Sequence, residues 1–180
     1  MRKLWMFVAV LFAAAVPSYA QGSYPTTEIF GGYSYLSAQP FGERTGFNGW
    51  GFSFAGNFGE KWGGVAEFSG NYKSIEETLP GVGTVKIDTS IYTFLFGPRY
   101  SARGSGTTAF AHVLVGGARL KVGSGSRTDF AMALGGGVDV NAGKSLAIRL
   151  AQADYFPNHI NGEWNSDFRF QAGIVLKLGN

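Results

Sequence analysis

The stretch that decides the fold is DFAMALGGGVDV, residues 129–140, because its alternate residues form two faces of very different character. The bulky face consists of Phe130, Met132, Leu134, Gly136, Val138 and Val140. The small face consists of Ala131, Ala133, Gly135, Gly137 and Asp139. Alternation with a period of two predicts a β-strand. A half-buried strand of a soluble sheet shows a polar face to water, and this strand has almost none.

The composition of the whole chain agrees with an all-β protein. The 180 residues include 28 glycines, 16 phenylalanines, 8 tyrosines and 4 tryptophans, and no cysteine. Aromatic residues favour strands, and glycine disfavours helices. The length suits one domain with its own core. Without cysteine the chain has neither a disulfide framework nor a thiolate metal site.

The first twenty residues, MRKLWMFVAVLFAAAVPSYA, have the pattern of a cleavable export signal. Two basic residues precede an apolar run from Leu4 to Val16, and Ser18-Tyr19-Ala20 provides a small-x-small cleavage site. The run is too short for a transmembrane helix. Loss of Arg2 and Lys3 lowers the formal net charge from +3 to +1, so no basic surface points to nucleic acid. We therefore expect a signal peptide at 1–20 and an exported domain at 21–180.

Segments of about ten residues with alternating character recur along the mature chain. They are 26–36, 47–58, 62–72, 87–100, 108–120, 129–140, 145–156 and 167–179. Long polar connections at 37–46, 73–86, 121–128 and 157–166 alternate with short ones at 59–61, 101–107 and 141–144. Such alternation is typical of barrels with long outer loops and short periplasmic turns. It predicts an eight-stranded antiparallel up-and-down transmembrane β-barrel.

The two faces of these segments predict which side chains enter the barrel. Trp50, Phe52 and Phe54 share one face of their segment, opposite glycine, alanine and serine. We expect the bulky rows to face lipid and the small rows to fill a narrow lumen. The charged residues on the inner faces are Glu28, Glu67, Arg99, Asp139, Arg149, Arg169 and Lys177. Buried charges need partners, so these residues predict a structural polar network, with a gate or narrow ion path as the alternative.

Two segments leave the facing of some residues open. Segment 108–120 is apolar on both faces, and we place His112 inside. In 145–156 the row Leu146, Ile148, Leu150 faces lipid, but the same parity would point Gln152 and Asp154 outward too. Either a β-bulge near Leu150–Ala151 reverses the parity, or the strand has left the hydrocarbon by Gln152.

Five stretches resemble the small OmpA/OmpX-type outer-membrane β-barrel proteins: EIFGGYSYL, TFLFGPRY, FAHVLVGGARL, AIR with QADYF, and FRFQAGIVLKLG. The resemblance covers residues 24–180. It implies a monomer in the bacterial outer membrane, surrounded by lipid and inserted by the barrel assembly machinery. The family shares its fold more than any activity. Two departures are the absence of a following peptidoglycan-binding domain and the end Leu178-Gly179-Asn180 in place of a terminal aromatic residue.

The remaining motifs do not predict catalysis. Gly143-Lys144-Ser145 lacks the glycine spacing of a phosphate loop, and a strand follows it rather than a helix. Of the two histidines, His159 lies near Glu163 and Asp167, where a weak metal site is less expected than solvated loop residues.

We therefore expect no catalytic residue, metal or cofactor. The predicted function is a structural or adhesin-like, surface-interaction role, with an extracellular partner reached through the loops 37–46, 73–86, 121–128 and 157–166. A narrow porin-like channel and a soluble, periplasmic, lipocalin-like binder are the alternatives.

Overall fold

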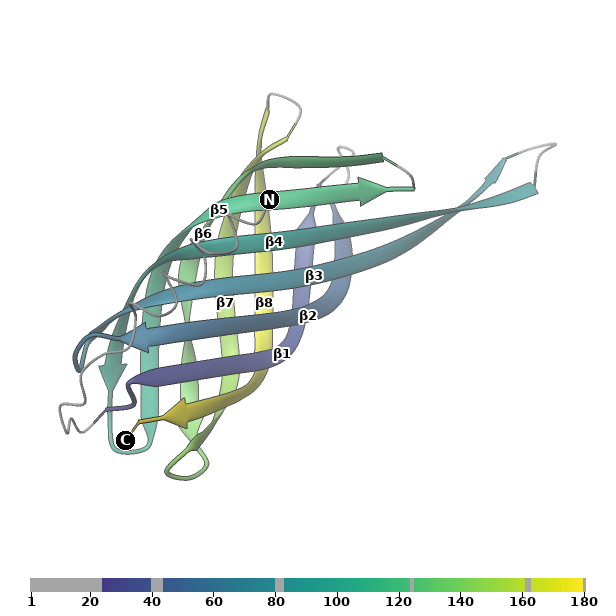
Figure 1. Ribbon diagram of the computed structural model, residues 1–180. Helices are drawn as coiled ribbons and strands as arrows, with labels where there is room; N and C mark the ends of the chain where they lie inside the picture. Colours follow the sequence, from purple (N-terminus) through teal and green to yellow (C-terminus); the bar gives the residue numbers. More distant parts are fainter. Residues whose placement is uncertain (1–23, 40–43, 80–82, 124, 161–162, 180) are drawn as a thin grey trace, which may run out of the picture.

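The structure is a computed structural model that describes residues 24–39, 44–79, 83–123, 125–160 and 163–179, so the expected signal peptide at 1–20 lies outside the described residues. The strands are β1 (Thr27–Ala38), β2 (Thr45–Asn57), β3 (Trp62–Leu79), β4 (Gly83–Arg103), β5 (Thr107–Val122), β6 (Gly125–Asn141), β7 (Leu146–Ile160) and β8 (Glu163–Leu178). Each strand pairs antiparallel with the next, and β8 pairs back to β1, which closes the barrel (Figure 1). The predicted fold is confirmed. Among the described residues no helix is long and apolar enough to span a membrane.

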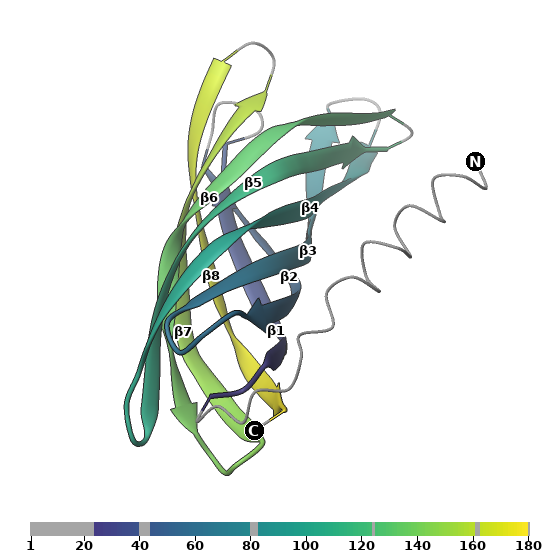
Figure 2. The ribbon, with the colours of Figure 1, turned by 60° about the vertical axis from the view of Figure 1, so that its left-hand side comes forward.

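The two ends of the barrel differ in the length of their hairpins (Figure 2). At one end, the turn end, lie the short turns 58–61, 104–106 and 142–145, together with the start of β1 and the end of β8. At the opposite end, the loop end, the β3–β4 hairpin projects well beyond its neighbours (Figure 1).

The predicted outer loops were too long, because strand pairing continues through most of three of them. Pairing reaches Leu79↔Gly83, Val122↔Gly125 and Ile160↔Glu163. The predicted turn at 101–107 was also too long, since β4 runs on to Arg103. The sequence signal is weaker in these parts because polar and glycine residues are frequent there, although Ile75, Leu79 and Val85 keep a trace of the alternation in 73–86.

The outer wall of the barrel is apolar, as the alternation predicted. Its large exposed side chains include Phe52, Phe68, Phe94, Phe96, Val113, Phe130, Leu134, Ile148, Leu150, Phe170, Ile174 and Leu176. Aromatic residues flank this belt at both ends. Trp62 and Tyr100 meet edge-on at 5.2 Å near the turn end, and Tyr72 and Tyr92 do so at 5.7 Å towards the loop end. An apolar belt between two aromatic girdles is what a transmembrane barrel presents to lipid.

The small face of the opening stretch makes room for its neighbours in the lumen. A Cβ added at Gly135 would lie 2.2 Å from the carbonyl oxygen of Ala153 and 2.3 Å from a carboxylate oxygen of Asp154. A Cβ at Gly137 would lie 2.5 Å from the carbonyl oxygen of Ala151. Side chains at these positions would collide with backbone, so glycine permits the close approach of β7.

A β-bulge in β7 decides the facing of Gln152 and Asp154. Asp139 pairs with Arg149 and Val138 with Ala151, so Leu150 is the extra residue against β6; β8 shows the same shift. Leu150 and Ala151 both point outward, whereas Gln152 and Asp154 are buried. The bulge alternative is therefore correct, and the exit of the strand from the hydrocarbon is not needed to explain the pattern.

Deletion of Leu150 tests whether this residue is the one that the bulge adds to β7. Without the extra residue, Ala151 takes the outward place of Leu150, and regular pairing keeps Gln152 and Asp154 inward, so we expect the deletion variant to refold into lipid vesicles. Heat-modifiable migration in gel electrophoresis reports the folded barrel. The variant Leu150→Ala keeps the bulge and should refold. Loss of refolding in the deletion variant, with normal refolding of Leu150→Ala, would contradict this assignment.

Candidate functional site

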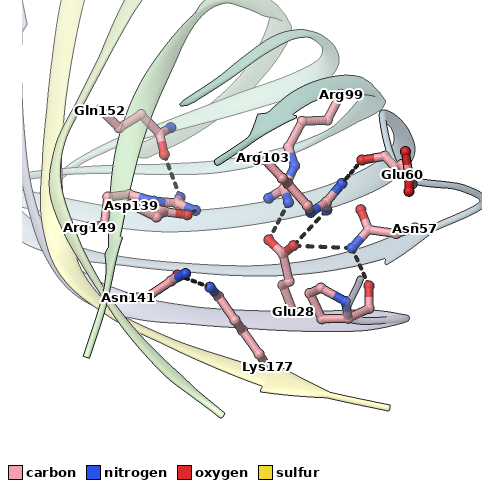
Figure 3. Close-up of polar contacts among 11 residues, drawn as sticks. Glu28, Asn57, Glu60, Arg99, Arg103, Asp139, Asn141, Arg149, Gln152 and Lys177 are labelled. Atoms are coloured by element: carbon pink, nitrogen blue, oxygen red, sulfur yellow. Dashed lines mark hydrogen bonds and ion pairs between the residues drawn. The ribbon is translucent and has the colours of Figure 1, made fainter. Parts of the chain in front are cut away.

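All seven charged residues that the sequence placed in the lumen have buried side chains. Their exposed fractions run from 0% for Arg169 to 8% for Lys177. They come from six of the eight strands: β1, β3, β4, β6, β7 and β8. The structure divides most of them between two clusters, one near the turn end and one in the middle of the barrel. Lys177 stands apart and contacts the Asn141 side chain near the turn end (Figure 3).

The turn-end cluster is built around Glu28 (Figure 3). Its carboxylate forms ion pairs with Arg99 and, at 2.9 Å, with Arg103. The Asn57 side-chain nitrogen donates to the same carboxylate at 3.1 Å and to the carbonyl oxygen of Pro25 at 2.7 Å. Arg103 also donates to the carbonyl oxygen of Glu60 in the β2–β3 turn. This cluster therefore joins β1, β2 and β4 at the end where the chain enters the barrel.

The central cluster begins with Arg149, which spans the lumen from β7. Its Nε and one terminal nitrogen donate to the two carboxylate oxygens of Asp139 at 2.8 and 3.2 Å, and the other terminal nitrogen donates to Gln152 at 2.7 Å. The guanidinium carbon lies 4.3 Å from the ring centres of both Phe30 and Phe110. The bidentate ion pair with Asp139 compensates the charge of Arg149. The two aromatic rings add cation–π contacts with its guanidinium group.

Asp154 extends the central cluster towards the loop end. It accepts from Arg169 at 2.7 Å, from Gln152 at 2.9 Å, and pairs at 2.8 Å with His112 Nε2. Arg169 also forms an ion pair with Glu67, to which Gln152 donates at 3.0 Å. One amide thus links the Arg149–Asp139 pair to the Arg169 pairs, and the cluster joins β3, β5, β6, β7 and β8.

Charges in the two clusters are balanced. The carboxylates are Glu28, Glu67, Asp139 and Asp154, and the arginines are Arg99, Arg103, Arg149 and Arg169. The Phe110 ring stands between the clusters, 5.2 Å from the Arg99 guanidinium carbon and 4.3 Å from that of Arg149. Ion pairs in a low-dielectric interior gain little net free energy, but loss of one partner leaves an unpaired buried charge.

Several members of the clusters were not identified as site residues from the sequence. Asp154 and Gln152 were missed because the bulge reverses the parity that would have marked them. Arg103 was assigned to a turn, and β4 continues through it. Asn57 shares the inward parity of Ser53 and Ala55, so that alternation was the available signal. His112 was placed inside correctly, although the sequence offered no sign of its partner.

The described side chains contain no cluster of three or more His, Asp or Glu residues arranged to hold a metal ion. The His159 and Glu163 side chains lie outside the described ones, so the weak loop site remains a prediction. Asp167, the third residue of that set, is buried and accepts a hydrogen bond from the Gln39 backbone nitrogen at 3.1 Å. The carboxylates and arginines of the two clusters are thus paired with one another, while both side-chain amide atoms of the buried Gln171 have no hydrogen-bond partner.

Replacement of Arg169 by methionine tests the energetic importance of the central cluster. Glu67 and Asp154 would lose their arginine, and we expect the free energy of unfolding to fall by about 3–5 kcal/mol. Adding Glu67→Gln and Asp154→Asn to the same chain should recover much of that loss, because no buried charge is then left unpaired. Denaturant titration of the refolded barrel, followed by tryptophan fluorescence, measures both values.

The less buried Arg127–Asp129 pair provides the comparison for this measurement: its separation is 2.7 Å, and the two side chains are 50% and 11% exposed. Arg127→Met should lower the free energy of unfolding by clearly less than Arg169→Met does, because Arg127 is half exposed to solvent whereas Arg169 is fully buried. Equal effects of Arg169→Met and Arg127→Met would contradict a stabilising role for the central cluster.

The chain matches no protein-family model and no curated protein. Its structure is similar to solved structures of small membrane barrels. Ail, the attachment invasion locus protein of Yersinia pestis, solved with the heparin analogue sucrose octasulfate, matches with a TM-score of 0.58 and 18% identity over 83% of this chain and 97% of that one. Neisserial surface protein A matches with a TM-score of 0.61 and 12% identity, over 85% and 97%.

The outer membrane protein OprG from Pseudomonas aeruginosa matches with a TM-score of 0.54 and 13% identity, over 88% of this chain and 98% of that one. These matches span nearly the whole of each relative, so the likeness concerns the complete barrel. At such low identity the likeness establishes the fold. The chain therefore has the fold of small outer-membrane β-barrel proteins, and the resemblance predicted from the sequence is confirmed at that level.

Proposed function

We propose that this protein is an integral outer-membrane β-barrel with a surface-interaction role and a closed lumen. The observation that carries the proposal is the inverted distribution of side chains. Phe96 and Ile174 are 60% and 55% exposed on the outer wall, while Arg169 and Asp154 are 0% and 2% exposed inside. A barrel in water would expose its charges and bury its aromatic residues, whereas lipid requires the reverse.

The proposed orientation rests on the expected export signal and on the even number of strands. With the mature N-terminus in the periplasm, the turn end lies there too, and the loop end faces the outside. Lipid surrounds the apolar belt, and the barrel assembly machinery is the expected route of insertion. Each barrel closes on itself, so a monomer needs no partner to cover a sheet edge.

Interaction with the surroundings is assigned to the loop end. The β3–β4 hairpin extends furthest from the barrel (Figure 1), and hairpins of this kind can vary without disturbing the wall. Among proteins of this fold, Ail was solved with a heparin analogue, which supports a role in binding extracellular partners. We assign no catalytic role, since the buried His112 is hydrogen-bonded to Asp154, which also binds Arg169 and Gln152 within the lumen.

Cell fractionation combined with protease treatment of whole cells tests this location and orientation. We expect the mature protein to remain with the outer membrane, to require detergent for release, and to show heat-modifiable migration. External protease should cut within 73–86 and 157–166, whereas the turns 58–61 and 142–145 should be protected. Release without detergent would favour the soluble lipocalin-like alternative, and protected outer hairpins would contradict the orientation.

Planar-bilayer recording separates the closed barrel from a narrow channel. The paired clusters occupy an eight-stranded lumen that is just wide enough for side chains, so we expect no discrete conductance from the wild-type protein. Discrete conductance that changes in Arg149→Ala or Glu67→Ala would instead identify the lumen as an ion path. The exposed substitution Lys144→Ala, in the β6–β7 turn, serves as the control.

A further inference from the structure

We propose that Arg119 and Lys121 form a binding site on the outer wall for the phosphate groups of an anionic lipid in the outer leaflet. Both side chains are exposed on β5, two residues apart, and therefore project from the same face of the strand. With Tyr92 and Ser126 they line an open recess of about 550 Å³. The inference rests on the proposed location of the barrel in the outer membrane.

The recess spans three neighbouring strands. Arg119 lies opposite Tyr92 of β4 and Thr128 of β6, and Lys121 lies opposite Ser126. A terminal nitrogen of Arg119 donates to the Ser126 hydroxyl at 2.9 Å. This bond uses one of the five N–H donors of the guanidinium, so the others remain available to an incoming oxyanion.

The depth of the site matches that of lipid headgroups. The outward residues of β5 run from Ala109 through Val113 to Gly117, and Arg119 follows directly. Eight residue steps cover about 27 Å along the strand, or about 21 Å along the barrel axis at a tilt of about 40°. That distance is close to the apolar band of about 25 Å in transmembrane barrels. Arg119 therefore sits at the outer edge of the belt, beside the girdle residue Tyr92, and Lys121 lies just beyond it.

The charge around the site is unbalanced in favour of an anion. The residues that face outward beside Arg119 and Lys121 are Ser90, Tyr92, Ser126 and Thr128, none of which is acidic. The nearest carboxylate along β4 is Asp88, which accepts a hydrogen bond from the Ser74 hydroxyl at 2.7 Å. In the two clusters of the lumen, by contrast, each arginine is paired with a carboxylate of the chain.

Phosphate is the anion that suits these groups at this depth. The planar fork of an arginine binds two phosphate oxygens, and a lysine adds a point charge with three donors. Near a membrane, basic residues attract anionic headgroups, while a neutral lipid offers no net charge to bind. The flanking Tyr92 supplies the amphipathic ring that membrane interfaces favour.

Native mass spectrometry of the refolded mature barrel, released from neutral detergent micelles, tests the site. The probes are diphosphorylated lipid A and the same lipid after enzymatic removal of its phosphates. We expect the wild-type barrel to retain the phosphorylated form selectively. The double variant Arg119→Gln/Lys121→Gln should bind it about thirty-fold more weakly, since each basic residue contributes one attractive headgroup contact.

A double variant at the opposite end, Lys61→Gln/Lys144→Gln, removes the same charge from exposed positions and should bind as the wild type does. Equal losses in both double variants would reduce the effect to overall charge and overturn the site. Equal retention of the dephosphorylated lipid, or displacement of lipid A by the soluble polyanion sucrose octasulfate at comparable concentration, would also overturn it.

Failure of the proposed function is distinguishable from failure of this inference. If the protein is not a membrane barrel, neither the wild type nor any variant will show heat-modifiable migration in lipid. If all forms fold and insert but none selects the phosphorylated lipid, the barrel assignment stands and the phosphate site is wrong.

Discussion

Asp154 is the side chain on which the interior of this barrel depends most. Three strands reach its carboxylate: β8 through Arg169, β5 through His112 and β7 itself through Gln152. An eight-stranded barrel is too narrow to hold bulk water around buried charges, so the protein must supply every counter-charge. That requirement explains the bulge at Leu150–Ala151, which turns Asp154 inward, and the glycine at position 135, which leaves room for it.

The paired lumen and the apolar wall are two results of one constraint. The outer surface of the barrel is in contact with lipid and is not hydrated, and the narrow lumen has room for very little water. Backbone groups are satisfied by closure of the sheet, and charged side chains by one another. The two faces of residues 129–140 follow directly: Phe130 and Leu134 are exposed to the surroundings, while Ala131, Ala133 and Asp139 are buried within. Its small face is small because the lumen is already filled.

Alternation was enough to predict the strand number, the closure and the inward facing of the seven charged residues, because a period of two assigns each side chain to one face. The alternation gave wrong assignments where a bulge interrupted the period of two, and where no continuous apolar row marked one face of the strand. Because β7 contains one extra residue, the period of two placed Asp154 and Gln152 on the lipid-facing side, and they were left out of the predicted site. At the loop end, charged residues such as Glu77 interrupt the apolar row, so the continuation of β3 to Leu79 was assigned to a loop although Ile75 and Leu79 keep its spacing. Which charges pair with which depends on strand order and stagger, and these become definite only when β8 meets β1.

The long separations within the clusters have a consequence for the assembly of the protein. Glu28 and Arg99 are 71 residues apart in the chain, and Glu67 and Gln152 are 85 apart. Contacts between such distant residues form late, after the intervening strands have paired. Until then, each of these charges needs water or another polar partner, and an open sheet in hydrocarbon provides neither. Entry into the membrane and closure of the sheet are thus coupled steps. An intermediate in which β8 is not yet paired with β1 has to keep the charged side chains of its inner face hydrated.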